Sequence, residues 1–125
     1  MQKRILIIED DIQSLYMFTF LLEYNNYEVM QSNNGFDGIA KAKDFKPDGI
    51  ILDIQLPEMD GYEVIKELRK NDELVSIAII VVTSFAMIGD KNKALDAGAD
   101  GYIEKPIDPD TFISQMESYI TSLRN

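Results

Sequence analysis

The sequence predicts an α/β protein, a doubly wound parallel sheet of five strands in the order 2-1-3-4-5 flanked by five helices. Short apolar runs alternate five times along the chain with stretches whose apolar residues recur at helical spacing. The central runs at residues 50–52 and 77–82 are continuously apolar, as expected for strands that helices cover on both faces. At 125 residues the chain has the size of one domain, so a single, stand-alone domain over residues 1–125 is expected.

The strands are predicted from apolar runs that polar or turn residues bound. They lie at residues 5–8, 27–30, 50–52, 77–82 and 102–103, the last being the weakest. The helices between them are predicted from apolar residues three or four positions apart, which share one helix face. These faces are Ile12, Leu15, Thr19 and Leu22; Phe36, Ile39 and Ala40; Val64, Ile65 and Leu68; Ala94, Leu95 and Gly98; and Ile113, Met116, Ile120 and Leu123.

Two helix starts carry capping signals. Asp60 and Glu63 resemble a capping box at the start of the third helix. Asp108 before Pro109 predicts an N-cap followed by proline at the first position of the fifth helix.

Composition excludes several classes of function. The 12 basic and 22 acidic side chains give a net charge of −10, which argues against direct binding of nucleic acid. The chain has no Cys and no His, so Ser-His-Asp and Cys-His catalysis and His-ligated zinc are excluded. No apolar run is long enough for a signal peptide or a membrane span, and a cytoplasmic protein is expected.

Chemically capable side chains follow four of the predicted strands. In chain order they are Glu9 and Asp10, then Asp53, then Thr83 and Ser84, then Lys105. Ligands of doubly wound sheets bind outside the carboxyl ends of the strands, here between the first and third strands. We therefore expect a site flanked by Glu9, Asp10 and Asp53.

Each of these residues also has an ordinary structural explanation. An acidic pair can be a solvated helix start, and Asp53 can simply begin a loop. Thr83 suits any strand, and Lys105 can be a surface charge. The convergence of four separate segments on one edge of one sheet favours a common site.

Three clustered carboxylates repel one another unless a cation offsets their charge. Oxygen ligands and few carboxylates suit Mg²⁺, with Mn²⁺ as an alternative, better than a calcium cage. The calcium-loop, Walker and Gly-x-Gly-x-x-Gly patterns are absent, so the sequence supports neither Ca²⁺ nor a bound nucleotide cofactor.

Four motifs carry a family resemblance over essentially the whole chain. They are Ile-Leu-Ile-Ile-Glu9-Asp10-Asp11, Ile-Leu-Asp53-Ile-Gln-Leu-Pro57-Glu-Met-Asp-Gly61, Val-Val-Thr83-Ser84 and Tyr102-Ile-Glu-Lys105-Pro106. In this order and spacing they resemble bacterial response-regulator receiver domains, the CheY-like group of two-component signalling systems. Residues 53–58, 85–90 and 102–107 are most similar to single-domain cell-cycle regulators of this family.

The resemblance implies a signalling switch rather than an enzyme, acting only in its own phosphorylation and dephosphorylation. Asp53 would accept the phosphoryl group, and Thr83 and Lys105 would contact it. The metal ligands would be Glu9, Asp10, Asp53 and the backbone carbonyl of Gln55. Tyr102 would be a switch aromatic, although a half-buried edge-strand tyrosine is the ordinary explanation.

The resemblance also assigns the neighbouring residues. Lys105–Pro106 would be a cis peptide, and proline is the residue at which the cis form is cheap. Pro57 and Gly61 would shape the loop beside the site, and small Ser84 would leave the phosphoryl group room. We hypothesise that Phe85 shields the acyl phosphate from water.

The implied partners are a sensor histidine kinase or a histidine phosphotransfer domain, which would supply the histidine that this chain lacks. Phosphorylation would alter the face made by the fourth helix, fifth strand and fifth helix. The downstream target is not specified, and a monomer or weak dimer is expected. Three alternatives stay open: a receiver-like module that binds without phosphorylation, a magnesium-dependent phosphatase, and a receiver excised from a larger protein. The phosphatase would want a second acid where Gln55 stands.

Overall fold

A computed structural model describes residues 2–84 and 88–124, with side chains through residue 120. Five parallel strands form one sheet in the order β2-β1-β3-β4-β5. The strands are β1 (Arg4–Ile8), β2 (Glu28–Ser32), β3 (Gly49–Leu52), β4 (Ala78–Thr83) and β5 (Gly101–Glu104). The predicted fold class and strand order are confirmed.

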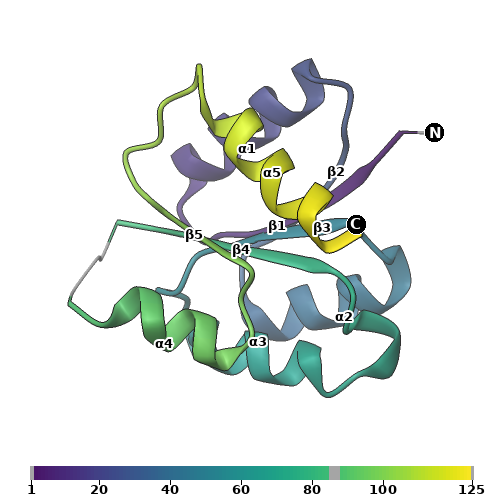
Figure 1. Ribbon diagram of the computed structural model, residues 1–125, viewed down its shortest axis with the longest axis vertical. Helices are drawn as coiled ribbons and strands as arrows, with labels where there is room; N and C mark the ends of the chain where they lie inside the picture. Colours follow the sequence, from purple (N-terminus) through teal and green to yellow (C-terminus); the bar gives the residue numbers. More distant parts are fainter. Residues whose placement is uncertain (1, 85–87, 125) are drawn as a thin grey trace.

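Helices cover both faces of the sheet in a three-layer arrangement (Figure 1). They are α1 (Ile12–Tyr24), α2 (Gly35–Phe45), α3 (Gly61–Arg69), α4 (Asp90–Ala97) and α5 (Phe112–Arg124), with a short 3₁₀ turn η1 (Asp72–Leu74). α1 and α5 lie on one face, and α2, α3 and α4 lie on the other. No helix in the described ranges is long and apolar enough to cross a membrane.

The sheet separates two apolar cores. Ile5 and Ile7 of β1 point to the α1–α5 layer, where Phe18 and Phe112 pack with ring centroids 5.3 Å apart. Leu6, on the opposite face of β1, joins the core under α2, α3 and α4. Every residue of β3 and β4 is buried. Their continuously apolar sequences thus match burial on both faces.

The predicted inner face of α1 is partly wrong. Phe18 and Leu22 are its fully buried residues, whereas Ile12 is 69% exposed. At 100° per residue, Ile12 lies about 120° around the helix from Phe18, so it cannot share the face that meets the sheet. Leu15, closer to Phe18 in this projection, is half-buried.

The fifth helix begins later than predicted. The carbonyl of Asp108 accepts the N–H groups of Thr111 and Phe112 at 3.1 and 2.9 Å, and its carboxylate accepts that of Asp110 at 2.9 Å. Asp108 therefore caps a turn that includes Pro109, and α5 itself starts at Phe112.

The fourth helix ends before Gly98, the last residue of its predicted apolar face. Gly98 ends α4 with φ +121°, a conformation that favours glycine, so it lies beyond the helix. Leu95 is 39% exposed, and Ala94 is the buried residue of this helix. At α3, by contrast, the Asp60 carboxylate accepts the Glu63 N–H at 3.0 Å, so the predicted cap is confirmed.

Candidate functional site

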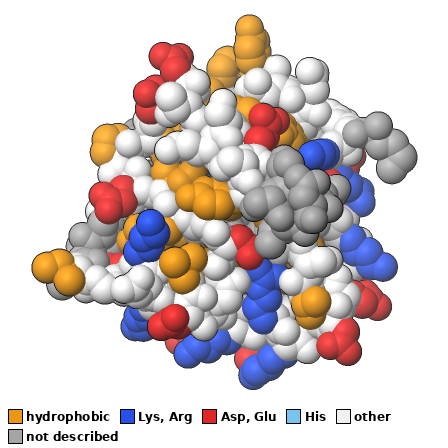
Figure 2. Space-filling model, in the orientation of Figure 1, with side chains coloured by type: hydrophobic (Ala, Val, Ile, Leu, Met, Phe, Trp, Pro, Cys, Tyr) orange, Lys and Arg blue, Asp and Glu red, His pale blue; other side chains and the backbone are white. Residues whose placement is uncertain are grey.

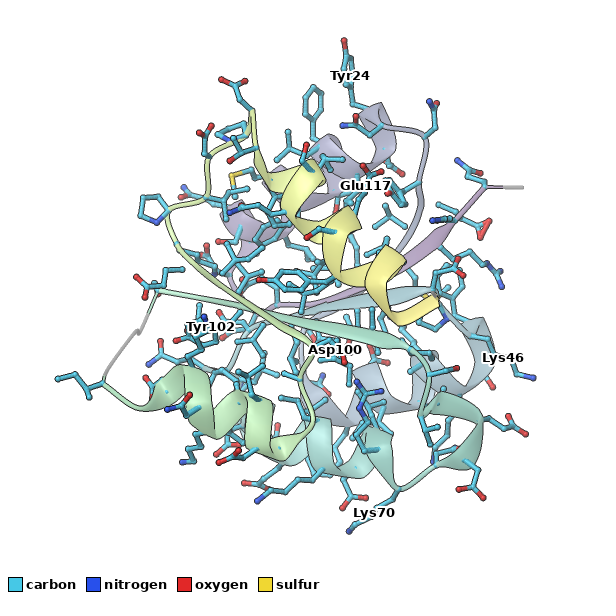
Figure 3. The ribbon with its side chains drawn as sticks, in the orientation of Figure 1. Tyr24, Lys46, Lys70, Asp100, Tyr102 and Glu117 are labelled. Atoms are coloured by element: carbon cyan, nitrogen blue, oxygen red, sulfur yellow. The ribbon has the colours of Figure 1, made fainter. Side chains whose placement is uncertain are left out.

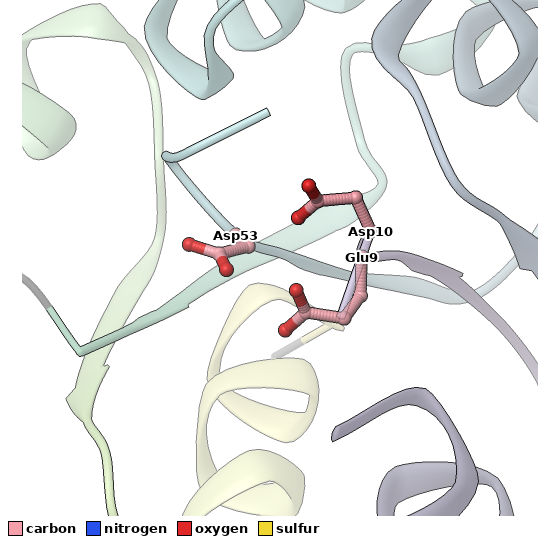
Figure 4. Close-up of side chains that lie close together, drawn as sticks. All are labelled: Glu9, Asp10 and Asp53. Atoms are coloured by element: carbon pink, nitrogen blue, oxygen red, sulfur yellow. The ribbon is translucent and has the colours of Figure 1, made fainter. Parts of the chain in front are cut away.

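Three carboxylates meet at the carboxyl edge of the sheet. Glu9 and Asp10 follow β1 directly, and Asp53 follows β3, its neighbour in the sheet. One oxygen of each lies within 4.8 Å of the others (Figure 4). The sequence prediction that Glu9, Asp10 and Asp53 share one site is confirmed.

The backbone holds these residues in place because the sheet pairing continues past the strand ends. The Glu9 N–H donates to the Ser32 carbonyl at 2.9 Å, and the Asp53 N–H donates to the Ile8 carbonyl at 3.1 Å. Glu9 and Asp53 are 1% and 7% exposed, whereas Asp10 is exposed. Backbone hydrogen bonds thus hold Glu9 and Asp53 in place, and the cluster is open to solvent on the Asp10 side.

Lys105 supplies the positive charge of the site. Its Nζ donates to Glu9 Oε1 at 2.5 Å and to Asp53 Oδ2 at 3.3 Å. The Lys105 side chain is 13% exposed, so the alternative explanation that Lys105 is an ordinary surface charge is wrong. The Lys105 N–H donates to the Thr83 carbonyl at 2.9 Å, which fixes this residue beside the end of β4.

The buried charges perturb one another. Burial, together with the neighbouring Asp53, raises the pKa of Glu9 to about 7 against the opposing hydrogen bond from Lys105. Burial lowers the pKa of Lys105, but its contacts with Glu9 and Asp53 outweigh that effect and the net shift is upward. The ammonium therefore stays charged, and the cluster as a whole carries excess negative charge.

Thr83 is the last residue of β4, and Ser84 follows it directly. Thr83 is buried and pairs in register with Glu104 of β5. Ser84 is exposed and lines, with Ser14, Met17, Lys105, Pro106 and Ile107, a hollow of about 350 Å³. The predicted cis peptide Lys105–Pro106 is confirmed. Phe85, for which we expect a shielding role, lies outside the described residues.

The comparisons with known proteins agree with this geometry. The family model for response regulator receiver domains matches residues 5–117. The chain belongs to the response regulator receiver domain family. Receiver domains act as signalling switches, and the acidic cluster around Asp53 fits the phosphoacceptor site of such a domain.

Relatives over almost the full length support the family. The receiver domain is 41% identical over 120 residues to the polar-differentiation response regulator DivK of Brucella anthropi, covering 96% of this chain and 98% of that protein. It is 39% identical over 120 residues to DivK of Brucella ovis, with the same coverage. The expected narrower likeness to single-domain regulators of this family is supported, because the match covers 98% of each of these DivK proteins.

Solved structures support the fold. A CheY-like receiver domain protein from Methanospirillum hungatei JF-1 matches with a TM-score of 0.91 and 31% identity, over 99% of this chain and 98% of that one. The receiver domain of sensor histidine kinase PA1611 from Pseudomonas aeruginosa PAO1 matches with a TM-score of 0.89 and 26% identity, over 97% and 99%. That crystal structure has a magnesium ion coordinated in the active site cleft.

The loop that follows Asp53 in the receiver domain is shaped by a close backbone approach. The Gln55 N–H donates to Asp53 Oδ1 at 3.1 Å, and the Gly61 N–H donates to the Ile54 carbonyl at 2.8 Å. A Cβ at Gly61 would lie 2.6 Å from Ile54 Cα and 2.8 Å from the Asp53 carbonyl oxygen. Only glycine fits there, which accounts for the shaping role expected of this residue.

Tyr102 is half-buried on β5, and its ring packs against the core under α2, α3 and α4 (Figure 3). Burial raises the pKa of its hydroxyl. That hydroxyl is buried and has no hydrogen-bond partner within residues 2–84 and 88–120. This position suits an edge-strand aromatic, and its switching role stays a prediction.

Ser14 belongs to the site, although the sequence prediction did not include it. Its Oγ donates to the Asp11 carboxylate at 2.7 Å and lies 3.4 Å from Lys105 Nζ. Asp11 is the N-cap of α1, and the hydrogen bonds from Ser14 lower the pKa of its carboxyl. The spacing Asp11-x-x-Ser14, typical of a helix start, was the available signal, but only the fold brings Lys105 to it.

Proposed function

We propose that Asp53 accepts a phosphoryl group from the phosphohistidine of a sensor kinase or phosphotransfer domain. The observation that carries this proposal is the position of Asp53 Oδ2, 3.3 Å from the Lys105 ammonium, within a group of three carboxylates. This position combines a carboxylate nucleophile, a fixed cation and an acidic cluster. Phosphoryl transfer needs mainly this positioning and charge neutralisation.

In the transfer step, an oxygen of the Asp53 carboxylate bonds to phosphorus while the phosphorus–nitrogen bond of the donor breaks. The electron pair of that bond leaves on the imidazole nitrogen, which takes up a proton from solvent. A carboxylate nucleophile has no proton to lose, so no general base is needed. This explains why a chain without histidine suffices for the acceptor side of the reaction.

The residues around Asp53 fit a hard divalent cation. Glu9, Asp10, Asp53 and the carbonyl of Gln55 would hold Mg²⁺, or Mn²⁺ in its place. All are oxygen donors, and the exposed position of Asp10 leaves room for the water ligands that Mg²⁺ keeps. When bound, the ion neutralises charge that develops on the phosphoryl oxygens.

Thr83 and Lys105 would contact the remaining phosphoryl oxygens. The hydroxyl of Thr83 would donate a hydrogen bond, and the Lys105 ammonium would turn from Glu9 towards the new dianionic group. Tyr102, which lies two residues before Glu104, the partner of Thr83 on β5, would follow and change the α4–β5–α5 face that partners contact. The net charge of −10 favours a protein partner over a nucleic acid.

Incubation with acetyl phosphate or phosphoramidate and Mg²⁺ tests the proposal. Intact-mass spectrometry should detect one added phosphoryl group, and chelation should prevent the addition. Asp53→Asn should abolish it, whereas Asp72→Asn, at the distant turn η1, should not. Full modification of the Asp53→Asn protein would exclude Asp53 as the acceptor.

A further inference from the structure

The outer side of α1 carries a row of exposed apolar side chains. Eight large hydrophobic residues are exposed in the described ranges, and four of them lie on this one helix. These four, which we call the α1 stripe, are Ile12, Tyr16, Phe20 and Tyr24, each 67–79% exposed. The rings of Phe20 and Tyr24 stack with centroids 6.1 Å apart. Tyr24 projects away from the sheet at the end of the helix (Figure 3).

The stripe stands out against the charge of the rest of the chain. Charged residues make up 27% of the sequence, yet Glu23 is the one charged residue among the 13 of α1. Acidic and basic side chains are spread over the surface, and hydrophobic side chains reach its rim beside α1 (Figure 2). A surface helix normally has one apolar face towards the core and one charged or polar face towards solvent. Helix α1 departs from this pattern because large apolar residues also lie on its solvent face. Its outer face has the composition of an interface.

The size of the stripe exceeds what an isolated surface residue explains. Large aromatic side chains present about 150–250 Å² each, so four residues at this exposure present about 600 Å². The largest apolar patch of a typical monomer covers about 300–600 Å². Pairing two such faces would bury about 1,200 Å² in total, the lower limit for a specific and reversible dimer.

The four residues are spaced by four, so they form a continuous ridge of the i±4n type. Two helices whose i±4n ridges interdigitate pack at about −50°, the commonest crossing in globular proteins. Because the same ridge would be present on both chains, a two-fold axis between Tyr16 and Phe20 would place Tyr16 against Phe20 of the second copy and Ile12 against Tyr24.

We propose that the α1 stripe is the interface of a reversible homodimer. The area of the stripe matches what a second copy would bury, and the distribution of charge favours this face. Two copies of a chain with net charge −10 repel one another over most of their surface, and they approach at the lowest electrostatic cost along α1, where the exposed Glu23 is the one charged residue of the helix. The proposal does not rest on phosphorylation of Asp53.

Sedimentation equilibrium of the full chain between about 10 µM and 1 mM tests the proposal. The wild-type chain should associate to a dimer in this range. Phe20→Glu should weaken association by about 100-fold or more, because each dimer would carry the buried charge twice. Phe36→Glu, a matched change at a 57% exposed phenylalanine of α2, should leave the dimer intact. Circular dichroism melting would show that both variants fold.

Cross-linking adds a positional readout, since the chain has no natural cysteine. A mixture of Tyr16→Cys and Phe20→Cys chains should form a bismaleimide-linked dimer faster than Phe36→Cys chains do. A wild-type chain that stays monomeric at 1 mM would overturn the proposal and leave the stripe to a helix of another protein. Equal dissociation by Phe20→Glu and Phe36→Glu would also overturn it.

Discussion

The Lys105 ammonium lies 3.3 Å from Asp53 Oδ2, although 52 residues separate the two in sequence. The same nitrogen also contacts Glu9 Oε1 at 2.5 Å. One cation thus compensates two almost fully buried carboxylates. This arrangement offsets part of the repulsion within the acidic cluster, and the ammonium would compete with a bound metal ion for the Glu9 and Asp53 oxygens.

Replacing Lys105 should therefore affect metal binding and phosphorylation in opposite directions. Lys105→Met removes the competing ammonium, so Mg²⁺ should bind more tightly, seen as a larger rise in melting temperature per unit of added Mg²⁺. Loss of the ammonium charge that would contact the phosphoryl oxygens should slow phosphorylation by acetyl phosphate about 100-fold. A variant with unchanged phosphorylation and weaker Mg²⁺ binding would contradict this role; Lys70→Met, an exposed lysine, is the control.

Gly61 should tolerate no side chain. Gly61→Ala places a Cβ against the backbone of Ile54 and Asp53, so the loop beside the acceptor must shift. Overpacking of this kind should lower the free energy of unfolding by about 1–3 kcal/mol, measured by urea denaturation, and slow phosphorylation. Gly89→Ala separates overpacking from backbone strain, because nothing lies within 4 Å there and only the positive φ is strained; it should lose stability without slowing phosphorylation. A phosphorylation rate lowered equally in both variants would show that the contact at Gly61 is not decisive.

Arg69 should be the principal polar support of the α3–α4 layer. It donates to the backbone carbonyls of Gly98, Leu74, Val75 and Ile77, and its NH2 group lies 2.7 Å from the Asp100 carboxylate. Lysine cannot reproduce this fork of donors, so Arg69→Lys should lower the free energy of unfolding by about 1.5–3 kcal/mol.

The neighbouring Lys70 provides the comparison for Arg69. Its ion pair with Glu67 is solvent-exposed, and Lys70→Met should change stability by less than about 1 kcal/mol in the same denaturant titration. An Arg69→Lys chain as stable as the Lys70→Met chain would mean that water replaces the lost donors without cost.

Tyr27 should make stability depend on alkaline pH. Burial, with the hydrogen bond to Glu117 Oε2, raises the pKa of Tyr27 above its ordinary value of 10.0. The unfolded chain then ionises first, so the contribution of Tyr27 is complete below pH 10 and declines as the pH rises beyond it. Tyr27→Phe should cost about 1 kcal/mol at pH 8 and less at pH 11 in guanidinium titrations.

Tyr24→Phe is the control for Tyr27→Phe, because it also removes a tyrosine hydroxyl but at a residue that is 79% exposed. If the difference between the wild-type and Tyr27→Phe chains were the same at both pH values, the pKa of Tyr27 would not be raised.

Much of the site could be predicted because parallel strands end at a common edge. The residue after each apolar run is therefore placed by topology alone, and this located Glu9, Asp10, Asp53 and Lys105 together. Side-chain periodicity was less informative at the helices. Ile12 fits the spacing of an inner face but lies outside it, since the spacing does not fix which face meets the sheet. The start of α5 was misplaced because a turn cap and a helix cap use the same residue, Asp108.

By itself, the sequence determined the alternation of strands and helices and the chemical types at the strand ends, because these depend on local pattern. Only the tertiary structure decided which oxygens Lys105 contacts, that Ser14 joins it, and that Glu9 is buried enough to shift its pKa. Contact distances and desolvation arise from the packing of segments distant in sequence, and no local pattern encodes them.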